Sequence, residues 1–189
     1  MRAPKRSTIV LGIDPGYCNT GWVAIDVVAD IPVACGLIRT AKDKRKVLVH
    51  EDDWARIQHV ASGLMNACTA HWPAAVVIEV PMGSRGAKAA VAMARAYAIC
   101  ACVAVWVGCP TVRVQAPDVK RVVTGQRDAS KGQLARSVLE HWTVLKDMAL
   151  KAVGRAPAKT EHIYDAAACV LGAWDSDVIK MARNVRRTT

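Results

Sequence analysis

Several features that often reveal a protein's class are missing from this sequence of 189 residues. It has no CxxC pair, and Cys100 and Cys102 lie too close together and too far from any histidine to indicate a zinc site. It has no internal repeat, no low-complexity linker and no recognisable secretory signal. We therefore expect a single domain spanning 1–189 in a cytosolic compartment, with its seven cysteines reduced and mostly packed in the core.

Acidic residues are scarce beside basic ones. The chain has 16 Asp and Glu against 26 Lys and Arg, and its formal net charge is +10. The excess is concentrated in a short arm at 1–8, in a loop at 41–50 and at the C-terminal end, about 176–189. This balance suits an anionic partner, of which nucleic acid is the commonest for a basic domain. The alternative is a generally basic surface that keeps the protein soluble.

Long apolar runs are also rare. Only Ala89–Cys109 is long enough to cross a bilayer, and it carries one charge, Arg95. The run is rich in alanine, which contributes little to membrane insertion, and it lies between two strand-like segments. We therefore expect a helix packed against a sheet and no membrane span.

Hydrophobic patterning predicts an α/β domain. We expect strands at about 9–13, 20–28, 32–39, 74–78 and 111–114. We expect helices that start near Glu51, run through the alanine-rich segment, cover about 117–124 and 130–142, and begin at Thr160 as N-cap and end at about 174. Apolar residues at helical spacing from Trp54 to Cys68 give the first helix one buried face. A strand meander followed by alternating helices and strands predicts a five-stranded mixed sheet with helices on both faces.

Carboxylates stand at the ends of two predicted core strands. Asp14 follows the apolar run 9–13 and precedes the turn pair Pro15-Gly16, and Glu79 follows the run 74–78. If these two strands pair in parallel, both carboxylates lie at one edge of the sheet. Asp165, on the last helix, is followed by an apolar stretch that draws it inward. The alternatives are an Asp14 that only shapes its turn, a solvated Glu79 and a surface Asp165.

A cluster of this composition fits a hard cation. Carboxylate oxygens are ligands that Mg²⁺ prefers, and two such ions about 4 Å apart can activate a water and stabilise a leaving oxygen. His162 lies three residues before Asp165 and so projects from the same helix face. It is a candidate metal ligand or proton-transfer group, and the alternative is a purely structural histidine.

An ordered set of motifs resembles the RuvC family of Holliday junction resolvases. The motifs are Gly12-Ile13-Asp14-Pro15-Gly16 with Thr20-Gly21, Val77-Ile78-Glu79, and His162-Ile163-Tyr164-Asp165-Ala166-Ala167-Ala168. The resemblance implies an RNase H-like fold, a homodimer and paired nicking of four-way DNA junctions in recombination and repair. It also implies Mg²⁺ as cofactor, two ions per site with Mn²⁺ as a substitute, and no small-molecule cofactor. Asp14, Glu79, His162 and Asp165 would then be both catalytic residues and metal ligands, since the family places Asp or His at the position of His162.

Two lysines extend this resemblance. Lys120, before a Val-Val-Thr-Gly turn, and Lys131, at the start of the next helix, match family lysines that contact the DNA backbone near the scissile phosphate. An ammonium pairs with a phosphate as a point charge. The alternative is a pair of solvated surface lysines.

The chain departs from the family in the loop after Glu79. Bacterial members carry an aromatic residue there, whereas this chain has Pro81-Met82 and no phenylalanine at all. Met82 can still wedge apolar surface between bases, but it cannot stack as an aromatic ring does. We expect the remaining DNA contacts to come from basic residues, namely Lys44, Arg45, Arg85 and Lys88. The long basic loop and tail are compatible with a phage-type member, in a bacterial or phage-infected cell.

Other functions remain open at this point. A YqgF-like or other RNase H-fold nuclease acting on RNA or other branched nucleic acid shares the opening strand but lacks the pair Lys120 and Lys131. A non-catalytic module that only binds junctions needs no metal. An actin-like nucleotide binder also ends its opening strand with Asp-x-Gly, but it requires a second glycine-rich hairpin and a much longer chain.

Overall fold

The protein is described by a computed structural model that covers residues 7–43, 45, 47–83 and 86–184. A mixed sheet of five strands forms its centre, as expected. The strands are β1 (Ile9–Asp14), β2 (Asn19–Asp26), β3 (Ile31–Arg39), β4 (Ala75–Glu79) and β5 (Thr111–Val114). Their order across the sheet is β3-β2-β1-β4-β5.

Strand β1 lies between the antiparallel and the parallel halves of the sheet. It runs antiparallel to β2 and parallel to β4, with Ile13 opposite Ile78. Strand β5 continues the parallel half and pairs with β4. The C-terminal ends of β1 and β4 therefore meet at one edge of the sheet, and this confirms the parallel pairing predicted for them.

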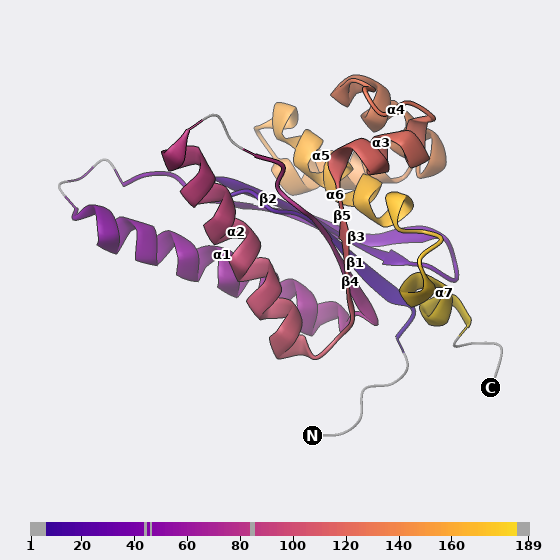
Figure 1. Ribbon diagram of the computed structural model, residues 1–189, viewed down its shortest axis with the longest axis horizontal. Coiled ribbons are helices and arrows are strands. Elements are labelled where there is room, and N and C mark those ends of the chain that lie inside the picture. Colours follow the sequence, from indigo (N-terminus) through magenta and orange to yellow (C-terminus); the bar gives the residue numbers. More distant parts are fainter. Residues whose placement is uncertain (1–6, 44, 46, 84–85, 185–189) are drawn as a thin grey trace.

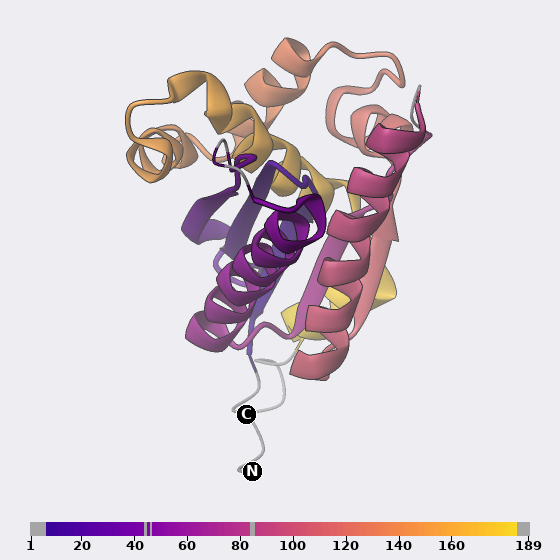
Figure 2. The same cartoon turned by 90° about the vertical axis from the view of Figure 1, so that its left-hand side faces the viewer.

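Helices cover both faces of the sheet (Figures 1 and 2). On one face lie α1 (Val49–His71) and α2 (Ala87–Val107). The other face is covered by α3 (Ala116–Thr124), α4 (Lys131–His141), α5 (Leu145–Val153), a 3-10 turn (Pro157–Lys159), α6 (Thr160–Gly172) and α7 (Asp177–Asn184).

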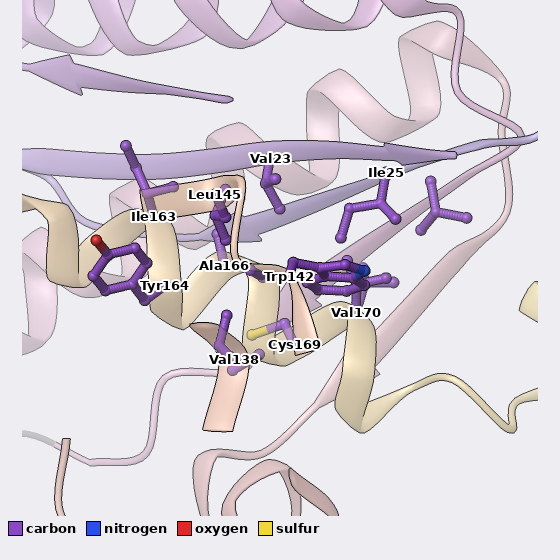
Figure 3. Close-up of a cluster of buried hydrophobic side chains, with 14 of the residues drawn as sticks. Val23, Ile25, Val138, Trp142, Leu145, Ile163, Tyr164, Ala166, Cys169 and Val170 are labelled. Carbon is purple, nitrogen blue, oxygen red and sulfur yellow. The ribbon is translucent and has the colours of Figure 1, made fainter. Parts of the chain in front are cut away.

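Each face of the sheet has its own core, because strand side chains alternate between the two sides. Leu11 and Ile13 point to α1 and α2, whereas Val10 points to the layer that contains α6. Figure 3 shows the second core, where Trp142 from the C-terminal end of α4 lies beside Val170 of α6. The chain thus fills this core without phenylalanine by using Trp142, which is only 3% exposed.

Helix α6 lies unusually close to the sheet. A Cβ added at Gly12 would collide with the backbone carbonyl of Ala166, and one added at Gly21 would collide with that of His162. The glycines of β1 and β2 and the small residues of α6 therefore permit this approach. Because α6 crosses β1 near its C-terminal end, the helix brings His162 to the edge where β1 and β4 end.

Some boundaries differ from those predicted. Helix α1 begins at Val49, and Trp54 is 62% exposed although its helical spacing placed it on the buried face. Thr160 is the first residue of α6 and not its cap, since its hydroxyl donates to the carbonyl of Pro157. The last helix ends at Gly172, and α7 follows as a separate helix. Helix α5 and the 3-10 turn were not predicted.

Helix α2 is the described helix that is long and apolar enough to span a membrane by length and composition alone. One of its faces packs on the sheet through Ile99, Cys100 and Val103, as expected for a helix against a sheet. The opposite face is exposed, and Val105 is 82% accessible to solvent.

Candidate active site

Asp14 and Glu79 are the last residues of adjacent parallel strands. Their side chains share the sheet face that carries Gly12 and Val77, because residues two apart in a strand point the same way. That face is the one on which α6 packs. The fold therefore brings both carboxylates to α6, as the sequence predicted.

His162 contacts Asp14 directly. Its Nδ1 lies 2.8 Å from Oδ2 of Asp14, and both side chains are largely shielded from solvent. The other ring nitrogen, Nε2, lies 3.7 Å from Oε1 of Glu161. The imidazole is thus oriented by one carboxylate on each side, an arrangement suited to holding or passing a proton.

Asp165 lies one turn further along α6 and faces Lys131. The Lys131 Nζ is 3.2 Å from Oδ2 of Asp165 and 3.5 Å from Oε2 of Glu161. Lys131 is the first residue of α4, and the start of this helix is fixed by a capping box between Ser130 and Gln133. The local sequence before α4 therefore determines where this ammonium stands.

These groups line one pocket of about 270 Å³. The pocket is lined by Asp14, Pro15, Gly16, Glu79, Ala116, Val119, Lys120, Lys131, Leu134, His162 and Asp165. All four predicted catalytic residues and both predicted lysines are among them. Three strand and helix carboxylates and two ammonium groups from distant parts of the chain thus share one cavity.

The carboxylates are close enough to affect one another's protonation. Burial, with the added repulsion of Asp14 and Asp165, raises the pKa of Glu79 to about 7. Burial and Asp14 also raise the pKa of Asp165, against the opposing effect of Lys131. Partial burial acts to lower the pKa of Lys131, but Asp165 and Glu161 outweigh it, so that pKa lies above its ordinary value. The site thus concentrates negative charge that lacks full compensation.

No three His, Cys, Asp or Glu side chains within the described ranges converge closely enough to hold one ion. The contacts above give a physical reason. His162 stands against Asp14, Lys131 stands against Asp165, and Glu79 contacts the thiol of Cys169. The donor set nevertheless fits a hard divalent cation, because carboxylate oxygens predominate among the polar groups that line the pocket.

Two residues near the site escaped the sequence analysis. Glu161 contacts both Lys131 and His162, and its place beside His162 in the sequence was the available signal. Cys169 is fully buried, and its thiol lies 3.9 Å from Oε2 of Glu79, where it donates a weak hydrogen bond. Its position one helical turn after Asp165 could have indicated that it faces the same strands.

The other predicted DNA contacts that the structure describes lie outside the pocket. Met82 is exposed in the loop after β4, and Lys88 is exposed in the first turn of α2. Arg45 is exposed and paired with Asp43 in the loop before α1, with Nη2 2.6 Å from Oδ2. Lys44 and Arg85 lie outside the described residues. The site geometry thus brings Lys120 and Lys131 to the carboxylates but not Met82, Lys88 or Arg45.

The sequence of the chain was compared with models of protein families. Residues 10–152 match the family described as "Crossover junction endodeoxyribonuclease RuvC". The chain belongs to the RuvC family. The matched range contains Asp14, Glu79 and both pocket lysines but ends before α6, which carries His162 and Asp165.

Curated RuvC proteins resemble the chain over about two thirds of its length. The RuvC protein of Methylorubrum populi is 30% identical over 131 residues, which cover 68% of this chain and 66% of that protein. The protein of Chlorobaculum parvum is 34% identical over 130 residues, covering 67% and 65%. The chain thus spans about two thirds of the length of these RuvC relatives.

Solved structures support the fold over a longer range. The RuvC protein of T. thermophilus in complex with Holliday junction substrate matches with a TM-score of 0.68 at 22% identity, covering 87% of this chain and 92% of that one. The yeast mitochondrial Holliday junction resolvase Ydc2 matches with a TM-score of 0.59 at 14% identity, covering 98% and 86%. These matches show the RNase H-like fold of the RuvC proteins and extend it through α6.

Proposed function

We propose that this chain resolves Holliday junctions by hydrolysing one phosphodiester in each of two strands, with Asp14, Glu79, His162 and Asp165 as catalytic residues. Family membership gives the general reaction: the chain is a crossover junction endodeoxyribonuclease of a metal-dependent family. One observation carries the finer assignment. The carboxylates at the ends of β1 and β4 meet the carboxylate of Asp165 on α6 in a single pocket that also contains Lys120 and Lys131.

We assign the metal ligands to Asp14, Glu79 and Asp165, with His162 as a fourth, and the metal to two Mg²⁺ ions. Mn²⁺ has a similar preference for oxygen ligands and would substitute. When bound, such ions supply a nucleophilic water at neutral pH and neutralise charge at the leaving oxygen. The elevated pKa of Glu79 supports this assignment, because a divalent cation would remove the repulsion that raises it.

The remaining pocket residues orient the substrate and the ligands. Asp14 holds the His162 ring by its Nδ1, which fixes the direction of Nε2 and lets the imidazole carry a proton to or from the reaction. Lys131 now contacts Asp165, and with a metal held by that carboxylate its ammonium would be free to bind the scissile phosphate. Lys120 lines the same pocket and provides a second positive charge for the DNA backbone.

Contacts outside the pocket would hold the branched DNA. Lys88 at the start of α2 and Arg45 in the loop before α1 are exposed at the same end of the sheet, because both segments follow strands that end there. Lys44 and Arg85 belong to the same two segments. Met82, 54% exposed, offers an apolar side chain to the bases at the crossover.

A second copy of the chain would supply the second cut. Exposed residues of α2 recur at alternating intervals of three and four, which is the spacing of a helix-packing seam. They are Val91, Ala94, Ala98, Ala101 and Val105. A contiguous apolar face of this kind is unusual on a monomer. Because the equivalent stripe of another copy has the same spacing, we propose that α2 forms the homodimer interface.

Cleavage of synthetic DNA tests this function. The purified protein is incubated with a four-way junction, a three-way junction, a flap and a linear duplex of the same sequences, in Mg²⁺ and in chelator. We expect paired nicks in the four-way junction with Mg²⁺ and none with chelator. Equal cutting of the duplex would contradict the junction assignment. A structured RNA is included as a further substrate, and preferred cutting of it would favour a YqgF-like nuclease. Junction binding without cutting in any divalent metal would indicate a binding module.

A further inference from the structure

A polar network lies behind the candidate active site, on the α1 and α2 side of the sheet. Tyr17 stands three residues after Asp14 in the loop between β1 and β2, and it is only 7% exposed. Its hydroxyl lies 3.0 Å from both the backbone carbonyl and Oδ1 of Asp53, in the second turn of α1. The loop that lines the pocket through Pro15 and Gly16 is therefore tied to a helix on the opposite face.

Asp53 is in turn held from α2. Oδ2 of Asp53 accepts a hydrogen bond of 2.6 Å from Nη1 of Arg95, and this is a partly shielded ion pair. Burial acts to raise the pKa of Asp53, but Arg95 and Tyr17 outweigh it and lower that pKa. Asp53 thus stays ionised and joins three segments: the loop between β1 and β2, α1 and α2.

The backbone of the same loop is fixed by Arg56 and Thr40. The guanidinium of Arg56 lies 4.1 Å from the centre of the Tyr17 ring, and its Nε donates to Oγ1 of Thr40 at 3.1 Å. The Thr40 hydroxyl donates to the carbonyl of Tyr17, and its amide donates to the carbonyl of Cys18. The carbonyls of Tyr17 and Cys18 are therefore both restrained by Thr40, and the bond from the Tyr17 hydroxyl to Asp53 restrains the side chain.

From this geometry we infer that Tyr17, Asp53 and Arg95 are positioning residues for the cleavage reaction. The inference rests on the proposed function of Asp14. The network fixes the loop that directly follows this ligand, and displacements below 1 Å at reacting groups cost large factors in rate. Apolar side chains would join α1 to α2 at a lower desolvation cost than an ion pair does. The polar network instead specifies one position for the loop and links it to α2.

Removal of the Tyr17 hydroxyl tests the inference. Tyr17→Phe keeps the ring under Arg56 but loses both contacts to Asp53. We expect kcat for four-way junction cleavage to fall by about 10- to 100-fold while KM stays within about twofold, because DNA contacts are untouched. Tyr97→Phe is the matched control, since Tyr97 is half-buried in the same layer and its hydroxyl makes no hydrogen bond within the described part of the chain. Equal kcat values for wild type and Tyr17→Phe would overturn the inference, and so would an equal loss in Tyr97→Phe.

A double-mutant cycle tests whether the residues act as one unit. If Arg95 works through Asp53 and Tyr17, the double variant Tyr17→Phe with Arg95→Gln should lose no more kcat than the more impaired single variant. Multiplied losses would contradict a connected network. We expect Arg95→Lys, unlike Arg95→Gln, to keep at least half of the wild-type kcat, because a cation at this position keeps Asp53 oriented. An inactive Arg95→Lys that folds like wild type would contradict this role.

A measurement without DNA separates this inference from the function on which it rests. Calorimetric titration of the DNA-free protein with MgCl₂, at a temperature where both proteins are folded, should show weaker binding for Tyr17→Phe than for wild type. A wild type that binds no Mg²⁺ and cuts no junction would contradict the proposed function itself. A wild type that binds and cuts, with a Tyr17→Phe variant equal to it in both, would contradict only the positioning network.

Discussion

At the scale of single residues, the surroundings of Glu79 in the pocket disfavour its charged form. Burial and two neighbouring carboxylates all favour its protonated form, and its pKa rises to about 7. The charged form therefore opposes folding when no cation is present. This is the expected state of a ligand whose partner is a metal and not another side chain.

The first prediction concerns stability without metal. Below a pH of about 4.5, Glu79 is protonated in both the folded and the unfolded state, and it has no effect. Above about 7, the folded state carries the full cost of the charge. In EDTA, Glu79→Gln should therefore raise the free energy of unfolding by about 1–2 kcal/mol at pH 8 and by little at pH 5.

Urea unfolding at the two pH values measures this difference. Glu140→Gln, an exposed residue of α4, is the control and should change neither value. A Glu79→Gln variant that is less stable than wild type at pH 8 would show that Glu79 is a structural residue. The same variant should be inactive on junctions, so stability and activity should move in opposite directions.

At the scale of elements, the contact of α6 with the sheet determines the site. Gly21 of β2 lets the carbonyl of His162 approach, and a methyl group at this position cannot be accommodated without a backbone shift. At β1, Gly12 lets the carbonyl of Ala166 in α6 approach in the same way. The catalytic geometry thus depends on residues that carry no functional group.

The second prediction follows from this contact. Gly21→Ala should displace the start of α6 from β2, lower the melting temperature and reduce junction cleavage by more than tenfold. Gly132→Ala, in the first turn of α4 where an added Cβ meets only one atom at 4.0 Å, is the control. Thermal unfolding and cleavage rates measure both effects. Full activity in Gly21→Ala would mean that the position of α6 is less critical than the structure indicates.

Much of the fold and the site was predictable at this scale, and the reason is local patterning. Apolar runs that end in Asp14 and Glu79 identified the two central parallel strands, and the spacing of His162 and Asp165 identified one helix face. Helix α5 was missed although its buried face, Leu145, Ala149 and Val153, has regular helical spacing. The exposure of Trp54 was not predictable, since it depends on where α2 lies beside α1.

The side-chain contacts within the site could not be predicted from the sequence either. Nothing local in the sequence shows that His162 turns to Asp14, or that Lys131 stands against Asp165. Likewise, Tyr17, Asp53 and Arg95 are separated by long stretches of chain and carry no shared pattern. These contacts follow from the packing of α1, α2 and α6 on the sheet, which only the folded structure specifies.

At the scale of the whole molecule, charge and the exposed face of α2 define two interactions. The basic surface would attract DNA, and the apolar seam of α2 would bind a second copy.

The third prediction concerns the binding of this second copy to α2. Val105→Asp places a charge at the most exposed point of the seam and should convert a dimer to a monomer in light scattering.

This variant should leave each active site intact and should therefore disrupt paired cutting more than single nicks. Val122→Asp, at an exposed apolar position on α3 away from α2, is a control for the added charge. A Val105→Asp protein that is still dimeric would contradict α2 as the interface.

The fourth prediction concerns salt. Binding of the junction should weaken steeply as salt rises, with a slope in the log–log plot of about −0.9 for each neutralised phosphate. Lys88→Ala should reduce the slope by about one, and Lys151→Ala, on α5, should not change it. Fluorescence anisotropy over a salt series measures the slope. An affinity that does not respond to salt would exclude the basic segments as DNA contacts.

The central claim is that Asp14 serves the chemistry and not the binding of DNA. The most direct test measures cleavage and binding of one four-way junction by Asp14→Asn in Mg²⁺, with Asp175→Asn, an exposed residue after α6, as control. The account predicts that Asp14→Asn folds normally, binds the junction at least as tightly as wild type and does not cut it. The control, Asp175→Asn, should both bind and cut the junction like wild type. Retained cutting, or loss of binding together with cutting, would contradict it.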